Sequence, residues 1–61
     1  MRARDIIRII EADGWYFFTQ KGSHAHYKHP VKPGRVTVPM HGSKDLRPEV
    51  VHSILKQARL K

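Results

Sequence analysis

Cysteine is absent from the 61-residue sequence, and both long hydrophobic runs and acidic residues are scarce. The lack of cysteine excludes a disulfide framework and a thiolate metal site, so we expect a cytoplasmic protein rather than a small secreted one. The longest uninterrupted apolar run covers only residues 15–18, which is too short for a membrane span or the core of a signal peptide. The sequence therefore predicts no membrane partner.

Positive charge is in large excess. The 12 Lys or Arg residues against 5 Asp or Glu residues give a formal charge of +7 with histidine counted neutral. A surface of this kind attracts polyanions, so nucleic acid is the expected partner. A chain of this length buries only about 60% of the surface that its unfolded form exposes, which leaves room for one thin core and a shallow active site. We therefore expect residues 1–61 to form a single domain.

Two segments carry apolar residues at the spacing of one helix face. Gly14 follows the first segment, where a left-handed residue can end a helix, and Pro48 suits the first turn of the second. The first stripe consists of Ala3, Ile6, Ile7 and Ile10. The second consists of Val51, Ile54, Leu55 and Ala58.

Three segments between these helices have the composition or alternation of β-strands, namely residues 15–20, 23–29 and 35–38. A turn is expected at Lys21-Gly22, and Pro39 is expected to end the third strand. Both helical stripes can be buried if the helices lie on one face of a three-stranded antiparallel sheet. The sequence therefore predicts a two-layer α+β domain with the order α-β-β-β-α.

The chemically densest segment is residues 21–30, with three His and two Lys around one turn and one strand. Imidazole can take a proton from a ribose 2′-hydroxyl or give one to a leaving 5′-oxygen near neutral pH, and lysine can hold phosphate, so a ribonuclease site is one interpretation. A metal site made of His24, His26 and His29 is a second, although His29 has the opposite strand parity. The third is a solvated strand face with Ala25 and Tyr27 turned inward.

Other residues give weaker signals. We interpret His41 as loop surface or a phosphate contact and place His52 on the polar face of the second helix. Trp15 and Phe17 share a strand face and are expected in the core. Two aromatic residues of the other parity could meet RNA: Tyr16 and Phe18.

Five stretches form a distinctive combination: EADGW at 11–15, QKGSH at 20–24, YKHP at 27–30, VTVP at 36–39 and SILKQA at 53–58. Together they resemble the HicA family of toxins from bacterial type II toxin–antitoxin systems, over nearly the whole chain. The resemblance implies a fold like that of double-stranded-RNA-binding domains and an mRNA interferase activity. It also implies that the histidine of the Gly-Ser-His motif, His24, is catalytic. Many members have a second His at the position of Ala25 and a Gly at that of Arg59.

The resemblance also implies a HicB-type antitoxin as the partner, which covers the active-site region and usually carries the DNA-binding domain, so that DNA is contacted only through it. The resulting hypothesis is an endoribonuclease toxin that needs no metal or other cofactor and uses His24 as general acid or base on RNA. The expected substrate-binding residues are Lys21, Gly22, Ser23, His26 and Lys28. Two alternatives are a non-catalytic double-stranded-RNA-binding module and a subunit whose basic surface meets an acidic protein.

Overall fold

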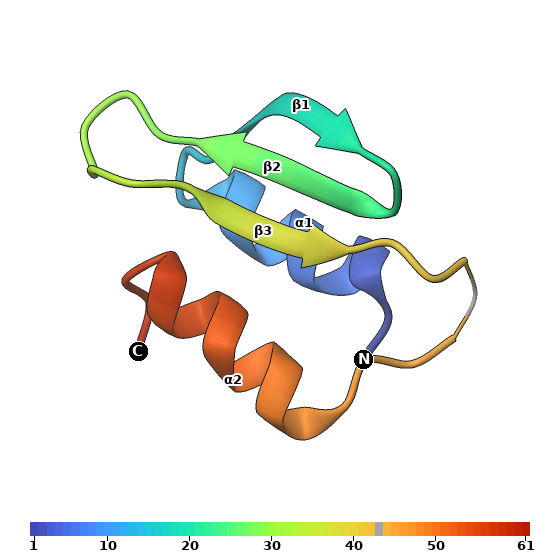
Figure 1. Ribbon diagram of the computed structural model, residues 1–61. Helices are drawn as coiled ribbons and strands as arrows, with labels where there is room; N and C mark the ends of the chain where they lie inside the picture. The colour runs from blue at the N-terminus through green and yellow to red at the C-terminus, as the bar shows by residue number, and fades with distance from the viewer. Residues whose placement is uncertain (43) are drawn as a thin grey trace.

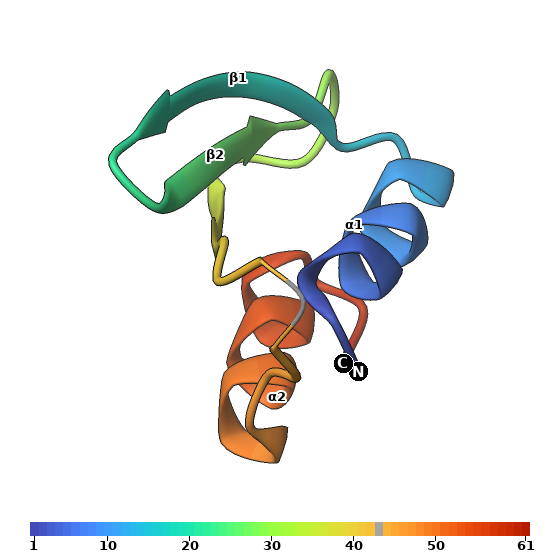
Figure 2. The same cartoon turned by 90° about the vertical axis from the view of Figure 1, so that its right-hand side faces the viewer.

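The computed structural model describes residues 1–42 and 44–61. The elements along the chain are α1 (Ala3–Ala12), β1 (Tyr16–Lys21), β2 (His24–Lys28), β3 (Val36–Pro39) and α2 (Pro48–Gln57) (Figure 1). The strands form one antiparallel sheet in the order β1-β2-β3, and both helices lie on the same side of it (Figure 2). The predicted two-layer α+β fold is confirmed, with every strand end within one residue of its expected place.

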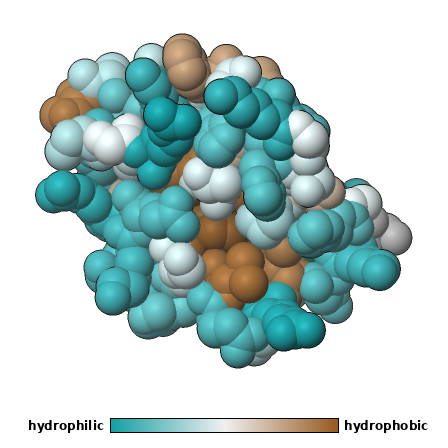
Figure 3. All heavy atoms as spheres, viewed as in Figure 1, coloured by the Kyte–Doolittle hydropathy of each residue, from teal (hydrophilic) through white to brown (hydrophobic). Residues whose placement is uncertain are grey.

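A single apolar core fills the space between the sheet and the helices. Its sheet side is formed by the inward residues of β2 and β3, and its helix side by the buried residues of the two predicted stripes. The largest fully buried side chains are Trp15, Ile6, Ile10, Ile54, Val36 and Val38. The side of the molecule seen in Figure 3 is largely hydrophilic, with an apolar area near its centre. None of the described helices is long and apolar enough to cross a membrane.

The end of α1 is closed by the glycine that the sequence predicts. The N–H of Gly14 donates to the carbonyl of Glu11 at 2.9 Å, and the N–H of Trp15 donates to that of Ile10 at 3.1 Å. This pair of bonds satisfies the last helix carbonyls and requires a positive φ, which is +110° at Gly14. A Cβ at this position would also lie 2.7 Å from Nε2 of His29. Glycine is therefore required at position 14 because of its positive φ and because the ring of His29 leaves no room for a Cβ.

The end of α2 has the same closure but carries arginine. The N–H of Arg59 donates to the carbonyl of Lys56 at 3.0 Å, and the N–H of Leu60 donates to that of Leu55 at 2.9 Å. Arg59 has a φ of +58°, which is a left-handed conformation that disfavours a side chain with Cβ. The helix thus ends as a glycine-capped helix would, with backbone strain at Arg59.

Relieving that strain should stabilise the protein. We expect Arg59→Gly to raise the free energy of unfolding by about 1 kcal/mol, because glycine adopts a positive φ without steric cost. Urea denaturation measures this difference, with Lys61→Gly as the control that removes one positive charge near the same terminus. An unchanged or lowered stability of Arg59→Gly would contradict a strained cap at this position.

Candidate active site on the outer face of the sheet

The two residues Gly22 and Ser23 form the whole loop between β1 and β2, because Lys21 and His24 are paired on either side of it. Gly22 has a φ of +58°, and a two-residue hairpin loop of this kind favours glycine at its first position. An added Cβ at Gly22 would meet no atom within 4 Å, so the backbone of the turn is open to a ligand. The turn therefore fixes the register that sets Lys21 directly opposite His24.

The outer face of the sheet, on the side away from the helices, collects the candidate site residues. Ala25 and Tyr27 are buried, so the alternating residues of β2 point away from the core: His24, His26 and Lys28. Lys21 belongs to the same face through its pairing with His24, and side chains of directly paired residues lie about 4.5–5.5 Å apart at Cβ. The structure thus brings four of the six predicted site residues onto the outer face of the sheet, with the other two in the adjacent turn.

His24 is the most accessible of these imidazoles. It is the first residue of β2 and is exposed, next to the open turn. It lies between Lys21 of β1 and Pro39 of β3 in the strand pairing. A ligand that reaches His24 therefore also reaches the lysine beside it.

His26 is held in place by the neighbouring strand. Its Nδ1 lies 3.0 Å from Oγ1 of Thr37, its paired residue on β3, and the side chain is half-buried. Desolvation lowers the pKa of His26 below its usual value, as do the nearby positive charges of Arg35 and Lys21. This imidazole is consequently neutral at neutral pH and can offer a nitrogen to a substrate without adding charge.

Two aromatic residues of β1, Phe17 and Phe18, are about equally exposed, whereas the strand pattern predicted that only Phe18 would be accessible. Phe17 was expected in the core, and this is wrong, because its side chain is 53% exposed and packs edge-on against Tyr27 with 5.9 Å between ring centroids. β1 is an edge strand, and its pairing with β2 is interrupted between Phe17 and Thr19. Phe18 is half-exposed as well, and its ring lies under Nζ of Lys28 at 4.3 Å. Phe18 therefore extends the outer face with an aromatic surface.

His29 is a structural residue, which sequence reasoning left open. The backbone N–H groups of Val31 and Lys32 both donate to its Nδ1 at 3.0 Å, so Nε2 carries the proton and donates to the carbonyl of Asp13 at 2.7 Å. Both ring nitrogens are in use, so His29 is not free to join His24 and His26 as a metal ligand. Nor do the described residues contain any group of three or more His, Asp or Glu side chains placed to hold a metal ion.

An ion pair reinforces the same region. Nζ of Lys32 donates to the Asp13 carboxylate and to the carbonyl of Ala58, the latter at 3.2 Å. The Lys32 ammonium group lowers the pKa of Asp13 below its ordinary value. Because Trp15 Nε1 also donates to the Ala58 carbonyl, at 3.3 Å, these contacts join the ends of α1 and α2 to the loop after β2. The strand that carries His24 is thereby anchored at its far end.

A family model described as the HicA toxin of bacterial toxin-antitoxin systems matches residues 3–60, which is nearly the whole chain. A search of curated proteins finds no match.

Proposed function

The chain belongs to the HicA family of bacterial toxin–antitoxin toxins, and from that premise we propose that it is an endoribonuclease that cuts messenger RNA and so stops translation and growth. The observation that carries the proposal is the pairing of His24 with Lys21 on the exposed outer face. An imidazole supplies acid or base chemistry near neutral pH, and a neighbouring ammonium group supplies charge stabilisation. Cleavage of RNA without a metal ion can be catalysed by these two groups together.

The proposed reaction is transesterification within the RNA. The 2′-oxygen of a ribose attacks the adjacent phosphorus, a P–O2′ bond forms, and the P–O5′ bond breaks. The products are a 2′,3′-cyclic phosphate and a free 5′-hydroxyl. His24 either takes the proton from the 2′-hydroxyl or gives one to the leaving 5′-oxygen, and positioned groups of this kind accelerate reactions by about 10²–10⁴-fold. No metal ion is needed for either proton transfer.

The other predicted residues have supporting roles in this proposal. Lys21 and Lys28 bind phosphate oxygens and offset the charge that develops during attack. Gly22 and Ser23 keep the turn narrow, which holds Lys21 opposite His24 and leaves open space beside Gly22. The neutral imidazole of His26 contacts the substrate from its fixed position beside Thr37.

A toxin of this family works with an antitoxin partner. We propose that the partner is a HicB-type protein that covers the outer face around His24, and that any contact with DNA is made by the antitoxin. The excess of positive charge, +7 over 61 residues, supports a partner surface of opposite charge. Toxicity and antitoxin binding would then use overlapping residues, so the bound toxin could not reach RNA.

Incubating the purified protein with RNA in excess chelator tests the proposal. We expect defined RNA fragments at low salt, because phosphate binding weakens as salt rises whereas the chemistry needs no metal. Intact RNA that binds tightly, with an affinity that falls steeply with salt, would instead identify a non-catalytic double-stranded-RNA-binding module. Fragments that form only after a divalent metal is added would overturn the metal-free mechanism.

A further inference from the structure

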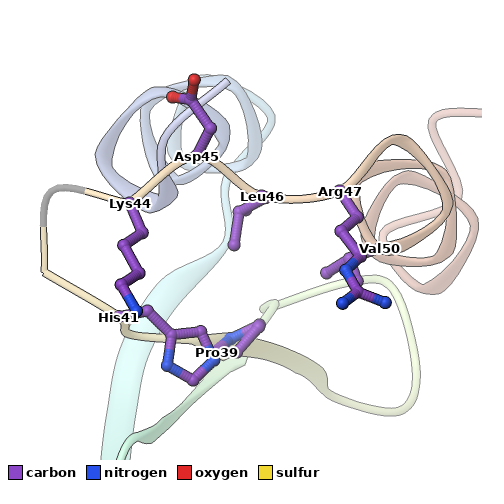
Figure 4. Close-up of a pocket in the computed structure, with 7 residues that line it drawn as sticks. All are labelled: Pro39, His41, Lys44, Asp45, Leu46, Arg47 and Val50. Atoms are coloured by element: carbon purple, nitrogen blue, oxygen red, sulfur yellow. The ribbon is translucent and has the colours of Figure 1, made fainter.

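A cavity of about 440 Å³ lies between the end of β3 and the beginning of α2 (Figure 4). Its size is within the range of pockets that bind small molecules or single groups of a larger ligand. The lining residues are Pro39, His41, Lys44, Asp45, Leu46, Arg47 and Val50. None of them belongs to the set that the sequence predicted to form the site.

The walls of this cavity combine positive charge with apolar surface. His41, Lys44 and Arg47 are exposed basic side chains, whereas Leu46 is buried and contributes apolar wall together with the remaining apolar lining residues. In Figure 4 the Lys44 side chain extends toward His41, and the carboxylate of Asp45 points the opposite way. Asp45 also lies 3.9 Å from the N-terminal amino group. With histidine counted neutral, the lining therefore holds two cationic side chains and one anionic side chain.

The cavity adjoins the candidate active site through the strand pairing. Pro39, which lines the cavity, is the β3 residue paired with His24. The next residue, Met40, donates its N–H to the carbonyl of Ser23 in the hairpin turn at 2.6 Å. The segment after β3 is thus hydrogen-bonded to the turn that precedes His24. Pro39 thus connects the cavity to the strand position opposite His24.

We propose that this cavity binds a nucleotide of the RNA strand next to the cleaved bond. Arg47 and Lys44 hold its phosphate, since a guanidinium group binds phosphate oxygens in pairs and an ammonium group adds a point charge. Pro39 and Val50 provide apolar contact for the base or sugar. The inference rests on the proposed RNA substrate and adds a binding site that fixes where along the strand His24 acts.

Binding measurements on a non-cleaving background test this assignment. His24→Ala serves as the parent, and fluorescence anisotropy with a labelled single-stranded RNA gives the affinity. We expect the pair Lys44→Gln and Arg47→Gln to weaken binding about tenfold to a hundredfold, as for the loss of hydrogen bonds to a charged group. The control pair, Lys56→Gln and Arg59→Gln, removes the same two residue types at the opposite end of α2 and should have a much smaller effect.

The outcomes separate this inference from the proposed function. A parent that binds RNA while both pairs lose affinity equally would overturn the cavity as a nucleotide site, because only the overall charge would then matter. A parent that does not bind RNA under any salt condition would overturn the proposed function itself and the inference with it. A selective loss in the Lys44 and Arg47 pair, with unchanged thermal stability, supports the site.

Discussion

Replacing Trp15 with alanine is expected to lower the free energy of unfolding by about 3–5 kcal/mol, the usual cost of truncating a buried tryptophan. The side chain is 2% exposed, donates from Nε1 to the Ala58 carbonyl and lies edge-on to the ring of His29 at 5.1 Å between centroids. A domain of this length is stabilised by roughly 3–9 kcal/mol in total. Most of the folded population should therefore be lost at physiological temperature.

Phe17→Ala is the matched control, since Phe17 is another large aromatic residue two positions along the chain. Its side chain is 53% exposed and has one edge-on aromatic contact, with Tyr27. We expect this change to cost about 0.5–1.5 kcal/mol, the range measured for aromatic pairs. Urea denaturation followed by circular dichroism measures both variants. Equal losses would contradict the different burial of the two residues.

His24→Ala is expected to lower the rate of RNA cleavage by about 10²–10⁴-fold, because it removes a general acid or base. The thermal midpoint should be almost unchanged, since His24 is exposed and surface substitutions rarely alter stability by more than about 0.5 kcal/mol. Single-turnover cleavage of a labelled RNA measures the rate. Growth after expression of the variant in cells gives an independent comparison.

His52→Ala is the control for this prediction. His52 is also an exposed histidine, but it lies on α2 rather than on the outer face of the sheet. We expect the His52→Ala variant to cleave RNA at the same rate as the unchanged protein. A folded His24→Ala protein that cuts RNA at the original rate would remove His24 from the mechanism. Equal losses of cleavage rate in both variants would show that the effect is not specific to the position of His24.

The helices and strands could be predicted because burial imposes a period on the sequence. Ile6 and Ile10 recur at helical spacing, and Val36 and Val38 alternate, so each set must face one side of its element. Gly14 and Pro48 mark helix ends for local conformational reasons. Since these signals span only a few residues, no knowledge of distant contacts is needed to interpret them.

The remaining features depend on contacts between distant parts of the chain. Phe17 alternates correctly for the core, but β1 is an edge strand whose pairing is interrupted beside it, and the ring stays half-exposed. The hydrogen bond between His26 and Thr37 requires the exact pairing of β2 with β3. His29 resembles its neighbours in sequence, yet a contact with Asp13, sixteen residues away, makes it structural.

The same reason explains why the cavity was not predicted. Lys44 and Arg47 belong to a short polar stretch that resembles any surface loop in sequence. Only the folded arrangement puts them around one hollow beside Pro39 and His24. The sequence predicts His41 as loop surface or a phosphate contact; it is an exposed loop residue that lines the cavity, and the phosphate contact stays a prediction.

Analysis of the RNA ends produced in excess chelator tests the central proposal most directly. The protein is incubated with an RNA and with the same RNA carrying a 2′-deoxy sugar at each cleaved position. We predict fragments with a 2′,3′-cyclic phosphate and a 5′-hydroxyl from the first RNA and none at those positions from the second, because the 2′-oxygen is the nucleophile. Cleavage of the 2′-deoxy substrate at the same positions, or no cleavage of either RNA, would contradict an acid–base ribonuclease centred on His24.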